Sequence, residues 1–251
     1  MNKYSYDINE IKRFVNALPD LEEKYVYLLM LCVRSRYAKE LLGVKVRDTV
    51  LLRDFVIWGD KWRDALIRRI LRMIVLAKNS EMVFRVKDLP VPSIATGIVI
   101  VINPARVDTA YIDFIKEITS DIINALWDRV AKMEKLWFSC LHKRTKRRFH
   151  TIDVDSKDEN IISHIESVLE KYGKWYMKIE TVRGFHYVID LKNIDTRYFT
   201  NFMKKELPEL SKKYIDEENK PIIEYKKDPL EPIPGTMYGG FLVKLHEINK
   251  T

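Results

Sequence analysis

Several features that mark particular classes of protein are scarce in this sequence. Its 251 residues include only 2 cysteines, Cys32 and Cys140, which are too far apart to indicate a zinc knuckle or a disulfide framework. No apolar run has the length of a membrane span. Residues 1–7 lack the apolar core and small-residue cleavage site of a secretory signal. We therefore expect a cytoplasmic protein with no membrane partner.

Positive charge, in contrast, is in excess. The chain has 44 Lys and Arg residues against 36 Asp and Glu, a formal net charge of +8. Such a balance favours polyanionic partners such as nucleic acid. A basic run precedes the central acidic motif and supplies candidate nucleic-acid contacts: Lys143, Arg144, Lys146, Arg147 and Arg148. The alternative for this run is an ordinary solvated surface segment.

Changes in hydrophobic period divide the chain into two regions. Residues 1–80 are predicted to be an N-terminal helical region, in which the apolar residues of 62–77 recur on one helical face. Residues 81–251 are predicted to form a mixed α/β (α+β) core. There, Gly97–Ile102 has the profile of a buried strand, and an amphipathic helix over 111–126 is expected to pack on the same sheet.

Two acidic residues alternate with apolar ones in Thr151-Ile152-Asp153-Val154-Asp155. On a strand, Asp153 and Asp155 leave the same face. Carboxylates are the hard oxygen ligands that Mg²⁺ and Mn²⁺ prefer, and two such ions can hold the reacting oxygens of a phosphoryl transfer. The alternative is an exposed strand with two incidental acids, since the motif is short.

A hairpin is predicted next, with strands over 175–179 and 185–189 joined by a turn at 181–184. By strand parity, His186 points away from the apolar side and can face a cleft. His186 and Arg183 could then donate hydrogen bonds to a triphosphate. The alternative is a histidine with a purely structural role.

The last motif is the loop Pro234–Gly240, whose backbone N–H groups have little steric cover. Thr236 in this loop and Lys244 beyond it are candidate nucleotide contacts, although an ordinary turn would look similar. Glu224 lies in the preceding strand-like run over 221–225. It is therefore a candidate third acid.

In order, Asp153-Val154-Asp155, Gly184-Phe185-His186 and Pro234-Gly235-Thr236 resemble the motif series of the archaeo-eukaryotic primase superfamily. The resemblance implies a primase-like core with an RNA-recognition-like mixed sheet and the activity of a DNA primase or polymerase. It implies that Asp153, Asp155 and a third acid bind Mg²⁺ or Mn²⁺, and that His186 meets the incoming triphosphate. We assign Glu224 as the third acid, although the family spacing places that acid somewhat earlier. The implied partners are a single-stranded DNA template, nucleoside triphosphates, and a helicase or other replication proteins.

The sequence also departs from the family. Residues 236–240 lack the histidine and lysine of the family loop Ser-Leu-His-Gly-Lys, which leaves Lys244 as the nearest cation. Because Glu224 does not match the family spacing of the third acid, one alternative is a catalytically inactive, DNA-binding replication protein with the primase fold. A second is a metal-dependent sugar transferase that uses the D-x-D pair, but this accounts for the first motif only.

Overall fold

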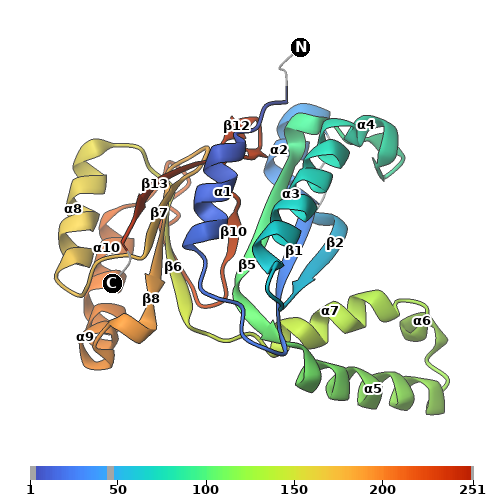
Figure 1. Cartoon of the computed structure of the whole chain (residues 1–251). Coiled ribbons are helices and arrows are strands. Elements are labelled where there is room, and N and C mark those ends of the chain that lie inside the picture. The colour runs from blue at the N-terminus through green and yellow to red at the C-terminus, as the bar shows by residue number, and fades with distance from the viewer. Residues whose placement is uncertain (1–3, 44–47, 250–251) are drawn as a thin grey trace.

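The computed structural model describes residues 4–43 and 48–249. It has a mixed α/β architecture built on antiparallel sheets, which confirms the coarse α+β prediction (Figure 1). The first sheet has the order β12 (Phe241–Leu242), β11 (Met237–Tyr238), β5 (Thr96–Arg106), β1 (Tyr25–Val33) and β2 (Thr49–Ile57), with β10 (Leu230–Pro232) also paired with β5. The second sheet has the order β13 (Lys244–Ile248), β7 (Met177–Glu180), β8 (Phe185–Asp190), β6 (Phe149–Val154) and β9 (Ile223–Lys226).

The helices cover the outer faces of these sheets and fill the space between them. In chain order they are α1 (Ile8–Ala17), α2 (Ser35–Leu42), α3 (Trp62–Lys78), α4 (Ser80–Val83), α5 (Val107–Ile123), α6 (Trp127–Val130), α7 (Met133–Lys143), α8 (Glu159–Glu170), α9 (Thr196–Asn201) and α10 (Leu207–Lys213). Shorter elements are the hairpin of β3 (Arg85–Val86) and β4 (Leu89–Pro90), the 3₁₀ helices η1 (Ser93–Ala95) and η2 (Leu191–Asn193), and the π-helical η3 (Phe202–Glu206). Within the described residues, no helix is long and apolar enough to cross a membrane.

The prediction of a helical region over residues 1–80 is wrong, because this region also contains strands. Strands β1 and β2 lie in this region, and β1 pairs with both β2 and β5, so residues on either side of position 80 share one sheet. The misassigned segment, Tyr25–Val33, is an almost unbroken apolar run because both faces of β1 are buried. Periodicity alone cannot distinguish such a run from a buried helix. The helix over Trp62–Lys78 was predicted correctly.

One core joins the two sheets. Phe14 of α1 and Ile70 of α3 pack with Ile100 of β5 and Val188 of β8, and all four side chains are fully buried. The other face of the second sheet is covered by α8, α9 and α10 (Figure 1). On the inner face of the second sheet, the end near Val188 is therefore apolar. The other end of this face can carry polar groups.

The helix predicted over 111–126 forms as α5, but it does not pack along the sheet as expected. It extends outward with α6 and α7 as a helical arm (Figure 1). Its aromatic residues Tyr111 and Phe114 contact Trp137 of α7 edge to face. Only the base of the arm, including Ala110, Cys140 and Leu141, is buried against the first sheet. Partners on a neighbouring helix therefore took the place of the sheet.

Candidate functional site

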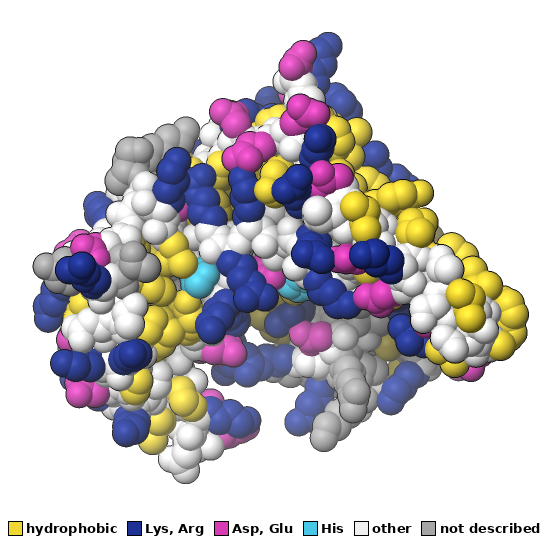
Figure 2. All heavy atoms as spheres, turned by 90° about the horizontal axis from the view of Figure 1, so that it is seen from below, with side chains coloured by type: hydrophobic (Ala, Val, Ile, Leu, Met, Phe, Trp, Pro, Cys, Tyr) yellow, Lys and Arg dark blue, Asp and Glu magenta, His cyan; other side chains and the backbone are white. Residues whose placement is uncertain are grey.

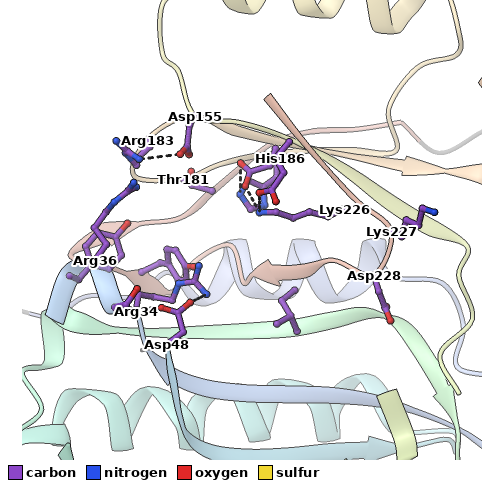
Figure 3. A pocket seen from close by; sticks show the side chains of 16 residues that line it. Arg34, Arg36, Asp48, Asp155, Thr181, Arg183, His186, Lys226, Lys227 and Asp228 are labelled. Carbon is purple, nitrogen blue, oxygen red and sulfur yellow. Dashed lines mark hydrogen bonds and ion pairs between the residues drawn. The ribbon is translucent and has the colours of Figure 1, made fainter. Parts of the chain in front are cut away.

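A pocket of about 710 Å³ lies where the second sheet meets β10, β11 and the start of α2. Figure 3 shows Asp155, Arg183 and His186 on one wall, and Arg34 and Asp48 on the opposite wall. In Figure 2 this region is a cleft between two lobes, with Lys and Arg side chains on both sides. Asp153, Asp155, Glu224, Arg183 and His186, all predicted as site residues, line this one pocket.

Three of these residues form a row across the second sheet. In the strand registers, His186 of β8 is directly opposite Asp153 of β6, and Asp153 is directly opposite Glu224 of β9. Residues that are paired in this way on adjacent strands project from the same face of a sheet. The antiparallel pairing therefore gathers side chains that are up to 71 positions apart in the sequence, from Asp153 to Glu224, on one wall of the pocket.

A buried network of alternating charges lies behind this row. His186 Nε2 is 3.1 Å from Asp153 Oδ1, and His186 Nδ1 is 2.7 Å from Glu231 Oε2. The Thr151 hydroxyl donates to Glu231 Oε1 at 2.6 Å, and the Lys226 ammonium donates to Asp153 Oδ2. Glu231 is fully buried, and such a carboxylate requires compensating charge and hydrogen bonds. The network thus fixes the position of Asp153 at the pocket wall.

The network shifts the pKa values of its members. Burial alone would raise the pKa of Asp153, but the charges of His186 and Lys226 outweigh burial and hold it well below its usual range. Burial alone would lower the pKa of His186, but the carboxylates of Glu231 and Asp153 raise it to about 10. Asp153 is therefore ionised and His186 protonated at neutral pH. Because both ring nitrogens of His186 contact carboxylates, His186 positions Asp153 in this structure.

Asp155 follows the end of β6 and is more exposed than Asp153. Its side chain is 42% exposed, and its Oδ2 is 3.1 Å from the Arg183 guanidinium. Gly184 brings the hairpin of Arg183 this close, because a Cβ atom at position 184 would lie 1.8 Å from the carbonyl oxygen of Val154. The glycine of the predicted Gly-Phe-His motif is thus required for close approach of two backbones.

Cationic and aromatic side chains form the opposite wall. Arg34 pairs with Asp48 at 2.7 Å and lies over the ring of Tyr238. Tyr238 meets Tyr37 edge to face, with 6.2 Å between ring centroids. The side chain of Arg36 extends toward Arg183 from this wall (Figure 3). Facing guanidinium groups beside half-buried aromatic rings suit a ligand that has both phosphates and a planar base.

Thr236 and Lys244, predicted as nucleotide contacts, do not line this pocket. Thr236 is fully buried, and its hydroxyl donates to the carbonyl oxygen of Ile233 at 2.7 Å, so it holds the turn together. Lys244 lies on β13, 3.6 Å from Glu180. The prediction chose Thr236 because it lies in the Pro-Gly loop and Lys244 because it is the nearest cation after that loop. The chain turns away from the pocket between Tyr238 and Lys244.

The predicted basic run connects α7 to β6, and several of its charges have acidic partners within the protein. Arg144 contacts Asp113 at 2.6 Å and Lys146 contacts Glu22 at 2.6 Å. Lys143 contacts Glu117 at 2.9 Å, and Arg148 contacts the buried carboxylate of Asp190. Arg147 is exposed and has no ion pair with the residues that the structure describes. Among the described residues, four of the five cations thus have an acidic partner and Arg147 has none.

Sequence reasoning missed several residues of the site: Lys226, Glu231, Arg34 and Arg36. Lys226 is two positions after Glu224, so strand parity could have placed both on one face. Glu231 had no comparable signal, because its burial and its contact with His186 depend on the pairing of β10 with the first sheet. The two arginines follow the apolar run that was taken for a helix.

The carboxylates of the pocket fit Mg²⁺ or Mn²⁺ in their chemistry, since Asp153, Asp155 and Glu224 are oxygen donors on one wall. Within residues 4–43 and 48–249, however, no three His, Cys, Asp or Glu side chains are grouped so that they could hold a metal ion. Lys226 and Arg183 contact the carboxylates of Asp153 and Asp155 instead. Metal binding at this wall therefore requires both cationic side chains to turn away from their partners.

Comparison of the chain with protein-family models, with curated proteins and with solved structures found no match in any of the three.

Proposed function

We propose that this protein is a metal-dependent nucleotidyltransferase of the primase-polymerase type, which joins nucleotides on a single-stranded template. The observation that carries the proposal is the row of His186, Asp153 and Glu224 across adjacent strands, facing one pocket with Asp155. Such a pocket combines hard oxygen donors on one wall with cations on the other, which is the combination that phosphoryl transfer from a triphosphate needs.

The residues of the site would have three different roles. Asp153 and Asp155, with Glu224 beside them, would hold Mg²⁺ or Mn²⁺, which lowers the pKa of a primer 3′-hydroxyl and neutralises triphosphate charge. His186 and Glu231 are positioning residues that keep Asp153 ionised and oriented. Arg183 and Arg36 would bind the phosphates, and pyrophosphate would leave through the open side of the cleft.

The test is the release of pyrophosphate from nucleoside triphosphates on a primed single-stranded template with Mn²⁺ or Mg²⁺. Asp155→Asn is the most informative variant, because Asp155 is 42% exposed and lies outside the buried network. We expect this variant to lose roughly 100-fold in rate. Glu159→Gln, which removes the same charge from an exposed position on α8, should release pyrophosphate at the native rate. No metal-dependent release by the native protein would refute the proposal.

A second candidate is a replication protein that binds DNA through this fold without catalysis. The observation that favours it is that both carboxylate oxygens of Asp153 already contact cationic groups, Oδ1 with His186 and Oδ2 with Lys226. In that case the ammonium of Lys226 permanently takes the place of a metal ion. If the native protein binds single-stranded DNA tightly but releases no pyrophosphate in Mg²⁺ or Mn²⁺, this candidate is the correct one.

A further inference from the structure

A second hollow, of about 520 Å³, lies between α7 and the first sheet and meets the first pocket at Asp228, which lines both. We call it the α7 groove and define it by Met30, Arg53, Lys135, Phe138, Lys143 and Arg147. We propose that the α7 groove binds single-stranded nucleic acid as it continues out of the first pocket. The proposal rests on the proposed function, because that strand would be the template.

Of the four cations that line the groove, Lys143 contacts Glu117 at 2.9 Å, and the other three are available to a polyanion. Lys135 and Arg147 are exposed, and neither forms an ion pair with the residues described. Arg53 is 3.9 Å from Glu134, a long contact with a side chain that is 69% exposed. By contrast, Arg144 and Lys146 point to acidic partners of their own and do not line the groove. Within the basic run, Arg147 and Lys143 therefore line the groove, although Lys143 pairs with Glu117, whereas Arg144 and Lys146 lie outside it.

The floor of the groove is apolar. Met30 and Phe138 line it, and the guanidinium of Arg53 lies 5.7 Å from the centre of the Phe138 ring. Unpaired bases have apolar faces that stack on aromatic rings, and positive charge beside such a ring follows the phosphates. In a duplex these base faces are hidden between neighbouring base pairs. An apolar floor beneath cations thus favours a single strand over a duplex.

The two pockets are connected by a short segment of chain. Asp228 stands between them and is held by His142 at 3.0 Å and by the Thr145 hydroxyl at 2.9 Å. Lys227 lines the first pocket next to Asp228 and is exposed. A strand that passes Lys227 would therefore move from the carboxylates of the first pocket directly onto the cations of the α7 groove.

The experiment is a fluorescence anisotropy titration of a labelled oligothymidylate at several salt concentrations. The test variant is Lys135→Ala/Arg147→Ala, and the matched control is Arg144→Ala/Lys146→Ala, which removes the same charge from the neighbouring segment. For a single strand, each lost phosphate contact reduces the slope of log K against log salt by about 0.7, so the test variant should lose about 1.4. The control should keep the native slope.

A third variant, Phe138→Leu, tests stacking while it preserves an apolar side chain at the groove floor. We expect it to weaken oligothymidylate binding roughly fivefold or more with the salt slope unchanged. The inference is overturned if the test variant keeps the native slope of log K against log salt, or if the test and control variants lose equal amounts of this slope. Pyrophosphate release that persists despite this result would leave the proposed function standing. If oligothymidylate binding depends on the groove but the native protein releases no pyrophosphate, the proposed function is refuted, and the inference that the α7 groove binds a single strand is supported.

Discussion

The buried network predicts that Glu231, which lies behind the pocket wall, and Glu224, which lines the pocket, differ sharply in their effect on stability. Glu231 is fully buried and contacts the protonated His186, whereas the Glu224 side chain is 71% exposed. Replacing Glu231 by glutamine keeps the volume and allows hydrogen bonds to Thr151 and His186, so the main loss is the negative charge. Breaking a buried ion pair from one side costs about 3–5 kcal/mol.

The lower end of that range applies here, because Asp153 still compensates the charge of His186 at 3.1 Å. We therefore expect Glu231→Gln to lower the free energy of unfolding by about 3 kcal/mol. For a chain of this size the corresponding fall in Tm is about 6–12 °C. Glu224→Gln should change the free energy of unfolding by less than about 0.5 kcal/mol.

Urea unfolding followed by circular dichroism measures both free energies, and thermal unfolding gives the two Tm values. If Glu231→Gln and the native protein have the same midpoint of unfolding in urea, the His186–Glu231 contact does not stabilise the fold, and the network argument is refuted. Equal destabilisation by Glu231→Gln and Glu224→Gln would contradict the argument as well, because it depends on the difference in burial between the two carboxylates.

Three further predictions concern packing and charge. Gly184→Ala should disturb the site, because the added Cβ would lie 1.8 Å from a backbone oxygen of β6, and its triphosphate affinity should fall in a fluorescent-nucleotide titration. Ile70→Ala, in the core between the sheets, should lower the free energy of unfolding in urea by about 2–5 kcal/mol. For Glu180, burial alone would raise the pKa, but hydrogen bonds from Lys157 and His246 lower it to about 2. The stabilisation by this group is therefore complete above the usual pKa of 4.5 and is lost as the pH falls toward 2. In urea unfolding at a series of acid pH values, the free energy of unfolding of Glu180→Gln should depend less on pH between 4.5 and 2 than that of the native protein.

Features of the fold that depend on local pattern could be predicted from the sequence. The apolar stripe of α3 has helical periodicity, and the buried strand β5 and the hairpin of β7 and β8 are runs rich in β-branched and aromatic residues that are bounded by turn residues. The strand β1 was missed because both its faces are buried, which removes the alternation that identifies a strand. The orientation of α5 was missed because its partner, α7, could not be known from the pattern of α5 alone.

The candidate site divides in the same way. Strand parity correctly placed Asp153 and His186 on faces that line one pocket. The contact of Glu231 with His186 joins segments 45 residues apart and arises only when β10 approaches the second sheet. Thr236 shows the opposite error, since its place in a glycine-rich loop indicated a ligand contact, whereas its hydroxyl closes a buried turn. Tertiary pairing, which a single sequence does not reveal, decides such cases.

The most direct test of the central claim is extension of an end-labelled primer on a single-stranded template of mixed sequence with Mn²⁺ or Mg²⁺, followed by separation of the products by length. The account predicts that the native protein and Glu159→Gln add only the nucleotide complementary to the next template base, and that Asp155→Asn adds roughly 100-fold more slowly. No extension by the native protein, or equal extension by Asp155→Asn, would contradict the account.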